Sequence, residues 1–170
     1  AEDEQLIERC PYRRPKGRRQ KRKVRRPAQT WEYVTLMRFG SKPLRRALFF
    51  LRRVGLRTKE MRELRWADVD LGETPHIALK KSKTGGPRKI GLDKATANWL
   101  RALKRNQRGV SEVVFVNCYG TPWDRHTFAR HLRRYAKRLG IDDGAAERVS
   151  AYCIRHTYVC DGIEAGVTTR

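Results

Sequence analysis

Acidic side chains are scarce in this 170-residue sequence, which contains 18 Asp and Glu against 40 Lys and Arg. The resulting net charge of +22 would repel itself in a compact chain unless a polyanion neutralises it. A nucleic acid is the polyanion that fits best, and an acidic membrane surface is the second choice. The composition therefore favours a partner that carries many phosphates.

The sequence also lacks paired cysteines, long apolar runs and a signal-peptide pattern. Its four cysteines form no CxxC pair, and Cys153 and Cys160 are spaced for core packing in one helix rather than for zinc ligation. We expect reduced structural thiols, no metal and no other cofactor. No apolar run is long enough to cross a bilayer, so we expect a soluble, cytoplasmic protein with no membrane partner.

The basic residues are densest near the beginning of the chain. Residues 9–26 hold eleven Lys and Arg and no acid, and prolines and a glycine interrupt any helix there. We therefore expect residues 1–27 to be a flexible basic arm or an interdomain linker. Residues 28–170 keep a net charge of +15, so the expected folded domain is basic in its own right.

Helical periodicity dominates residues 28–170, and the paired-strand signals are confined to one region. The pattern predicts an α+β fold that is mainly helical, with a small antiparallel sheet inserted after the third helix. The expected elements are helices over about 31–39 with Thr30 as N-cap, 43–54, 58–65, 94–106, 125–140 and from 151 onward, a hairpin of strands 76–81 and 87–92, and a short buried strand 113–116.

The stretch "SAYCIRHTYV", residues 150–159, presents a puzzle. Its apolar side chains surround the expected helix nearly completely, which predicts a buried helix with Tyr158 beside Ile154 in the core. Arg155 lies in the middle of this helix and cannot lose its charge. A buried arginine of this kind needs an anion, which is either an acidic side chain or a ligand.

Two other stretches also place a cation beside a structural breaker. "GLRTKEMRELRWADVD" puts Arg57 just after a glycine and three residues before Glu60, and "KSKTGGPRKI" puts Lys83 at the tip of the expected hairpin. Taken singly, Arg57 fits a solvated helix residue, Lys83 a solubilising turn residue, and Arg155 the buried half of an ion pair.

Taken together and in this order, the three stretches resemble the catalytic domain of the tyrosine recombinase (phage integrase) family. The matching signals are Gly-Leu-Arg-x-x-Glu with Leu-Arg-Trp-x-Asp-Val-Asp behind it, Lys-Thr-Gly followed by Pro-Arg, and Arg-His-Thr-Tyr. The segment 114–141 also resembles the family. The resemblance covers about residues 28–170 and implies the fold of the DNA breaking-rejoining enzymes, with double-stranded DNA as partner and a tetramer on DNA for the full-length protein.

The resemblance also implies roles for individual residues. Arg57 and Arg155 would clamp the scissile phosphate, Lys83 would protonate the leaving 5′ oxygen, and Lys81 is the alternative if the hairpin register shifts. Glu60 would orient Arg57, and His156 would support the site from behind. The other cations expected to contact DNA are Arg18, Arg19, Arg88 and Lys89.

The chain departs from the family pattern at two points. Tyr152 stands where the family usually has a histidine; a phenol can contact phosphate but is a poor general base at neutral pH. The nucleophilic tyrosine of the family lies beyond the second arginine by more residues than this chain has, so we expect the chain alone to bind DNA without forming a covalent intermediate. The alternatives are a recombinase remnant that binds DNA without cutting it and, on charge alone, an RNA-binding protein. The resemblance implies a bacterial or viral origin.

Overall fold

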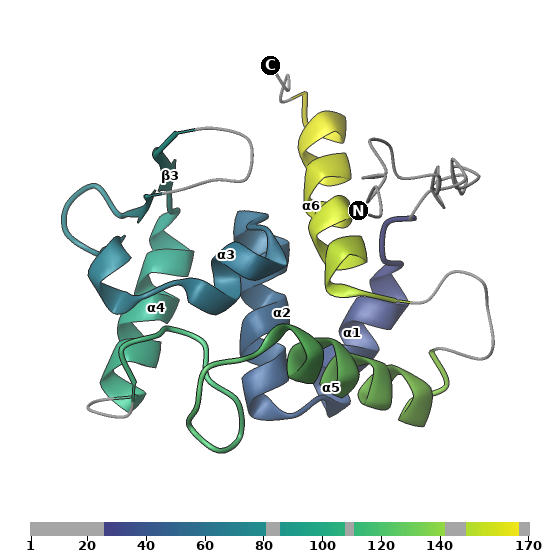
Figure 1. Ribbon diagram of the computed structural model, residues 1–170. Helices are drawn as coiled ribbons and strands as arrows, with labels where there is room; N and C mark the ends of the chain where they lie inside the picture. The colour runs from purple at the N-terminus through teal and green to yellow at the C-terminus, as the bar shows by residue number, and fades with distance from the viewer. Residues whose placement is uncertain (1–25, 81–85, 108–110, 142–148, 167–170) are drawn as a thin grey trace, which may run out of the picture.

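The computed structural model describes residues 26–80, 86–107, 111–141 and 149–166. Within these residues, one small sheet lies at the edge of a set of helices, and α3 lies between the sheet and α6 in Figure 1. This arrangement confirms the predicted α+β class. The elements in chain order are α1 (Thr30–Phe39), α2 (Lys42–Val54), α3 (Thr58–Glu63), the short 3₁₀ helix η1 (Trp66–Asp68), β1 (Val69–Asp70), β2 (His76–Leu79), β3 (Arg88–Gly91), α4 (Lys94–Asn106), α5 (Arg125–Arg138) and α6 (Ala151–Glu164).

Helix α2 is the central element of the core. It begins after Ser41 with a proline in its first turn and ends at Gly55, whose left-handed backbone (φ +64°) stops the helix. Its apolar stripe is buried as its periodicity predicts. The buried residues of α2 are Leu44, Ala47, Leu48, Phe50, Leu51 and Val54. Helices α1, α3 and α6 all pack against α2, so the core is organised around it.

Helix α1 begins one residue earlier than the sequence predicts. The N-cap is Gln29 and not Thr30, because the side chain of Glu32 accepts the backbone N–H of Gln29 at 2.7 Å. The Glu32 side chain is only 1% exposed, and its carboxylate accepts hydrogen bonds from Nη1 and Nη2 of Arg26. Burial raises the pKa of Glu32, but the hydrogen bonds from Arg26 and Gln29 outweigh burial and leave that pKa below its ordinary value.

The sheet has three antiparallel strands in the order β1-β2-β3. The predicted hairpin is confirmed as β2 and β3, in which Ile77 faces Ile90. Strand β1 was missed because it is only two residues long and carries no alternating pattern. The predicted strand 113–116 is wrong: residues 114–116 are buried, but they form only single bridges, Arg65 with Val113 and Val116 with Pro122.

Helices α4 and α5 begin as predicted at aspartate caps. The carboxylate of Asp93 accepts the N–H of Thr96 at 2.7 Å, and that of Asp124 accepts the N–H groups of His126 and Thr127 at 3.0 Å. No helix among the described residues is long and apolar enough to cross a membrane.

Helix α6 corrects the prediction of a helix buried all round. Only Ala151, Cys153 and Ile154 are buried, all in its first turn. Tyr158 is 41% exposed and does not lie in the core with Ile154. Helix α6 packs mainly on α2, and some of its apolar residues, such as Ile163, are exposed.

The contact between α5 and the start of α2 includes a half-buried histidine. The ring of His131 packs between Trp123 and Tyr135, with centroid separations of 5.2 and 5.1 Å, and Nε2 lies 2.9 Å from the hydroxyl of Ser41. Burial lowers the pKa of His131, and the nearby charge of Arg134 lowers it further. The neutral imidazole is therefore the form that the folded protein prefers.

We predict that this histidine makes the fold sensitive to mild acid. Because the folded protein has the lower pKa, the stability contribution of His131 is present above its ordinary value of 6.5 and is lost as the pH falls below that value. The free energy of unfolding, measured by urea denaturation, should fall between about pH 7 and pH 5, and the fall should be smaller in His131→Gln. An equal fall in both proteins would show that another group causes it.

Candidate active site

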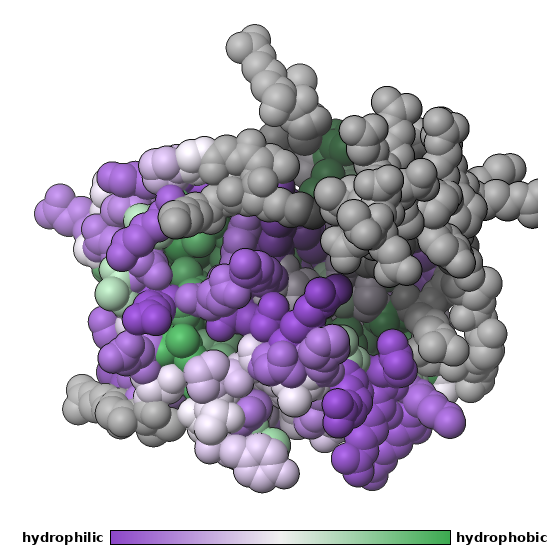
Figure 2. All heavy atoms as spheres, viewed as in Figure 1, coloured by the Kyte–Doolittle hydropathy of each residue, from purple (hydrophilic) through white to green (hydrophobic). Residues whose placement is uncertain are grey.

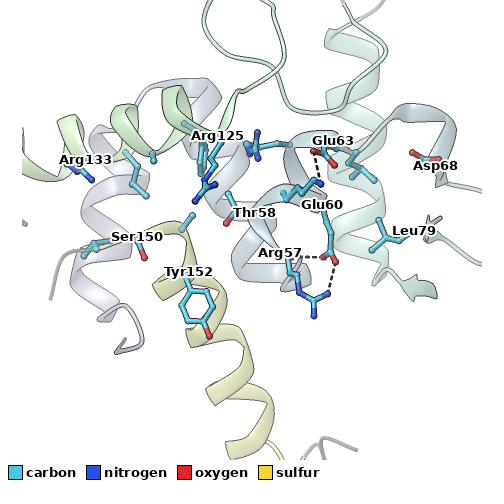
Figure 3. A pocket seen from close by; sticks show the side chains of 18 of the residues that line it. Arg57, Thr58, Glu60, Glu63, Asp68, Leu79, Arg125, Arg133, Ser150 and Tyr152 are labelled. Carbon is cyan, nitrogen blue, oxygen red and sulfur yellow. Dashed lines mark hydrogen bonds and ion pairs between the residues drawn. The ribbon is translucent and has the colours of Figure 1, made fainter. Parts of the chain in front are cut away.

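Arg57 lies at the N-cap of α3, three residues after Val54, the last residue of α2. The carboxylate of Glu60 accepts the backbone N–H of Arg57 at 2.8 Å and its Nη1 at 3.0 Å. The Glu60 side chain is 8% exposed, so this contact is largely shielded from water. The carboxylate of Glu60 thus caps α3 and also orients the guanidinium of Arg57 (Figure 3).

Glu60 also binds a second guanidinium, that of Arg88 at the start of β3. Nη2 of Arg88 donates to both carboxylate oxygens of Glu60, at 3.0 and 2.9 Å. The side chain of Arg88 is 37% exposed, and its Nε is buried without a hydrogen-bond partner. The structure therefore places Arg88, which we expected to contact DNA, against Glu60 and links the hairpin to α3.

Arg155 reaches the same cluster from α6. Its side chain is half-buried, and Nη1 donates to the carbonyl oxygen of Gly55. Burial lowers the pKa of Arg155, the charge of Glu60 opposes this effect, and the charges of Arg57 and Arg88 lower the pKa further. The sequence predicted that Arg57, Arg155 and Glu60 would be associated, and the structure brings these three residues together with Arg88.

Tyr152 lies on the first turn of α6 and is 51% exposed. Figure 3 shows its ring pointing to the same side of the cluster as the guanidinium of Arg57. The ring centroid of His156 lies 6.2 Å from that of Tyr152, and Nδ1 of His156 lies 3.7 Å from the sulfur of Cys160. His156 thus lies one turn after Tyr152 on α6, with its ring next to that of Tyr152.

Of the remaining cations predicted for the site or for DNA contact, one lies on β3 and the others lie outside the described residues. Lys89 is exposed on β3, and because adjacent strand residues point to opposite faces, it faces away from Glu60. Lys81 and Lys83, at the expected hairpin tip, and Arg18 and Arg19, in the expected arm, lie outside the described residues.

A groove of about 1160 Å³ runs from Arg57, Glu60 and Tyr152 toward α5. Its walls combine cations with apolar side chains such as Leu79 and Phe128. On the face drawn in Figure 2, hydrophilic side chains cover most of the described surface, with hydrophobic patches between them. The arginine cluster is therefore one end of a larger basic depression.

Two residues of this groove were missed by the sequence analysis. Arg125 and Arg133 project from α5 into the groove, as Figure 3 shows. They are eight residues apart with Ala129 midway between them, so they share one face of the helix. A helical wheel drawn on residues 125–138 would have shown this face, but nothing in the sequence indicated that it lines the same groove as Arg57.

This arrangement suits the binding of an oxyanion. Arg57 and Arg88 bind the carboxylate of Glu60, and its charge also acts on Arg155, so the cluster keeps an excess of positive charge. Guanidinium groups bind phosphate oxygens in a planar, bidentate geometry. Among the described residues, no group of three or more His, Cys, Asp and Glu is arranged to hold a metal ion.

Comparison with known proteins agrees with this geometry. The profile of the Phage integrase family matches residues 29–170, and the chain therefore belongs to that family. Comparison with curated proteins gives no match.

Solved structures show the same fold. The chain resembles the XerA recombinase (TM-score 0.65, 20% identity), covering 84% of this chain and 52% of that one. It resembles a lambda integrase dimer bound to a COC′ core site (TM-score 0.67, 21% identity, 85% of this chain and 43% of that one). It also resembles the lambda integrase catalytic core (TM-score 0.66, 18% identity, 83% and 85%). The chain thus has the catalytic-domain fold of tyrosine recombinases and spans about half the length of the XerA chain.

We predict that the charge of Glu60 is needed for stability. Glu60→Gln keeps the shape of the side chain but leaves Arg57, Arg88 and Arg155 without their shared counter-ion, and the free energy of unfolding should fall by about 1–3 kcal/mol. The matched control is Glu63→Gln on the same helix, where the side chain is 60% exposed and lies 3.9 Å from Lys59. The control should change the stability by less than about 0.5 kcal/mol. Equal effects of the two substitutions in chemical denaturation would contradict the central position of Glu60.

Proposed function

We propose that residues 28–170 form the DNA-binding catalytic domain of a site-specific recombinase and that residues 1–27 form a basic arm or linker that contacts DNA. The reaction is the cutting and rejoining of DNA by transesterification through a phosphotyrosine intermediate. Family membership supports the class of protein, and the basic groove supports the partner. The fold is also found in a lambda integrase dimer bound to a COC′ core site.

One observation carries this proposal: two arginines from distant parts of the chain meet beside one shielded carboxylate. Nη1 of Arg57 donates to the carboxylate of Glu60 at 3.0 Å, and the charges of both residues act on the pKa of Arg155. Glu60 supplies one negative charge against three guanidiniums, so a second anion would lower the Coulomb energy of the cluster further. A phosphodiester is the anion that the charge of this protein favours.

The proposed chemistry follows from the charge of the transition state. When a tyrosine oxygen attacks phosphorus, negative charge grows on the non-bridging oxygens while the bond from phosphorus to the 5′ oxygen breaks. Arg57 and Arg155 would stabilise that charge, with an effect comparable to the roughly 2.7–4 kcal/mol of an oxyanion-hole donor. In the proposal, Lys83 gives its proton to the leaving 5′ oxygen.

Tyr152 would contact the same phosphate through its hydroxyl group. Its exposure allows a phosphate to reach it, and Figure 3 shows its ring pointing to the same side as the guanidinium of Arg57. A phenol donates a hydrogen bond well but accepts a proton poorly at neutral pH. The second candidate function is a recombinase remnant that binds DNA without cleaving it. A tyrosine at position 152 favours this function more than a histidine at that position would.

Arg125 and Arg133 would extend the DNA-binding surface along the groove. They lie two helical turns apart on one face of α5, a separation of about 12 Å. This separation matches the width of the major groove, about 12 Å, so the two side chains can reach phosphates on opposite sides of it. Contacts of this kind position the duplex and carry no sequence information.

We predict that the affinity for duplex DNA falls steeply with salt. Each phosphate neutralised by Lys or Arg contributes about −0.9 to the slope of log Kobs against log salt concentration. The slope, measured by fluorescence anisotropy, should become shallower when residues 1–25 are deleted, because the deletion removes ten Lys and Arg and keeps Arg26 paired with Glu32.

Three outcomes of this titration would change the account. Equal slopes for the full and shortened chains would show that the arm does not contact phosphate. Binding without salt dependence would contradict the proposed DNA interface. Preference for a single-stranded or structured RNA competitor over duplex DNA would favour the RNA-binding alternative.

We also predict that this 170-residue chain alone forms no covalent adduct with DNA. Tyr158 packs its ring on Gly55, and Tyr152 occupies the position of a phosphate contact, so neither is proposed as the nucleophile. The assay incubates the chain with nicked suicide duplexes and separates the products on a denaturing gel, with lambda integrase on its own substrate as positive control. An adduct that Tyr158→Phe abolishes would identify Tyr158 as the nucleophile and refute this assignment.

A further inference from the structure

The end of α2 contains a peptide group that binds Arg155, two residues before Arg57 in the chain. Gly55 adopts a left-handed backbone (φ +64°, ψ 25°), and its N–H closes the helix on Leu51 at 3.0 Å. Its carbonyl oxygen accepts Nη1 of Arg155, which lies 100 residues later in the chain. The carbonyl end of a helix carries partial negative charge, so a guanidinium there is favourably placed.

Tyr158 covers the other side of the same glycine. It lies three residues after Arg155, on the same face of α6, and a Cβ atom added to Gly55 would overlap its ring. Since the Tyr158 side chain is 41% exposed, it contributes less to the core than a buried aromatic does. Its ring instead fixes how closely α6 approaches the end of α2 beside Arg155.

The segment from Gly55 to Arg57 is held at each of its three residues. Gly55 is bound by Arg155, Leu56 is fully buried, and the backbone N–H of Arg57 is bound by Glu60 at 2.8 Å. Two residues of extended chain span at most about 7 Å, so the anchor of Arg155 and the Cα atom of Arg57 cannot lie farther apart than that. The main chain therefore sets the spacing between the two arginines.

We infer that Gly55 and Tyr158 are positioning residues that hold Arg155 at a fixed distance and direction from Arg57, so that the two guanidiniums bind one phosphate as a unit. This inference rests on the proposed function. A guanidinium has five N–H donors, so the bond to Gly55 leaves others for a phosphate. Preorganisation of this kind strengthens binding because less side-chain freedom is lost when the anion arrives.

The test uses inorganic sulfate as the probe, because it is a tetrahedral dianion whose charge does not change near neutral pH. The Nε–Hε resonances of the arginines report where sulfate binds and at what concentration. In the wild-type chain and in Tyr158→Phe, which keeps the ring, the signals of Arg57 and Arg155 should shift with one shared midpoint. The exposed Arg138 on α5 serves as an internal control for non-specific binding.

Removing the ring should separate the two arginines. In Tyr158→Ala, the sulfate midpoint at Arg155 should rise by about tenfold relative to Arg57, the effect expected from loss of one charge-assisted contact. Gly55→Ala should act in the same way, because it displaces the ring and strains the left-handed backbone. The net charge is unchanged in both variants, so a weaker response of Arg155 to sulfate cannot come from a change in overall charge.

The results distinguish this inference from the proposed function. If Tyr158→Ala is folded by its amide spectrum and the two arginines still share one midpoint, Gly55 and Tyr158 do not position Arg155. If the wild-type arginines bind sulfate with two independent midpoints, the inference is wrong while the proposed phosphate site stands. If neither arginine of the wild-type chain responds to sulfate and the chain does not bind duplex DNA, the proposed function itself fails. Should Gly55→Ala not fold, the comparison of Tyr158→Ala with Tyr158→Phe decides the matter alone.

Discussion

The contact of one shielded carboxylate with two guanidiniums is the interaction on which the site depends. Glu60 binds Arg57 from its own helix and Arg88 from the sheet, and its charge also reaches Arg155 on α6. Without this carboxylate the three cations would repel one another across a partly desolvated space, where Coulomb interactions are stronger than in water. Glu60 thereby links α3 to the sheet through Arg88, and its charge makes a concentration of positive charge compatible with folding.

The fold places this cluster where a large anion can approach it. Helix α2 organises the core and ends at Gly55, where α3 begins on one side and α6 crosses on the other. The groove then continues past Tyr152 to the cationic face of α5, on which Arg125 and Arg133 project. The catalytic-domain fold of the phage integrase family therefore brings cations of α3 and α5 to one groove, with Arg88 of β3 held against Glu60 in its wall.

Much of the fold was predictable because its signals are local. The stripe of α2, the aspartate caps of α4 and α5 and the hairpin all follow from short patterns. The errors arose where tertiary contacts decide: β1 is too short to show a pattern, and the apolar residues of α6 falsely indicated burial all round. Motif order predicted Arg57, Glu60 and Arg155, whereas the pairing of Arg88 with Glu60 depends on sheet placement that no local pattern encodes.

The central claim is that Arg57 and Arg155 act on the same phosphate. The most direct measurement is a structure of the chain bound to a DNA duplex. The account predicts that both guanidiniums contact non-bridging oxygens of one phosphate, with Arg57 still bound to Glu60 and Arg155 still bound to the carbonyl of Gly55. A complex in which the two arginines contact different phosphates, or in which the duplex lies away from the groove, would contradict it.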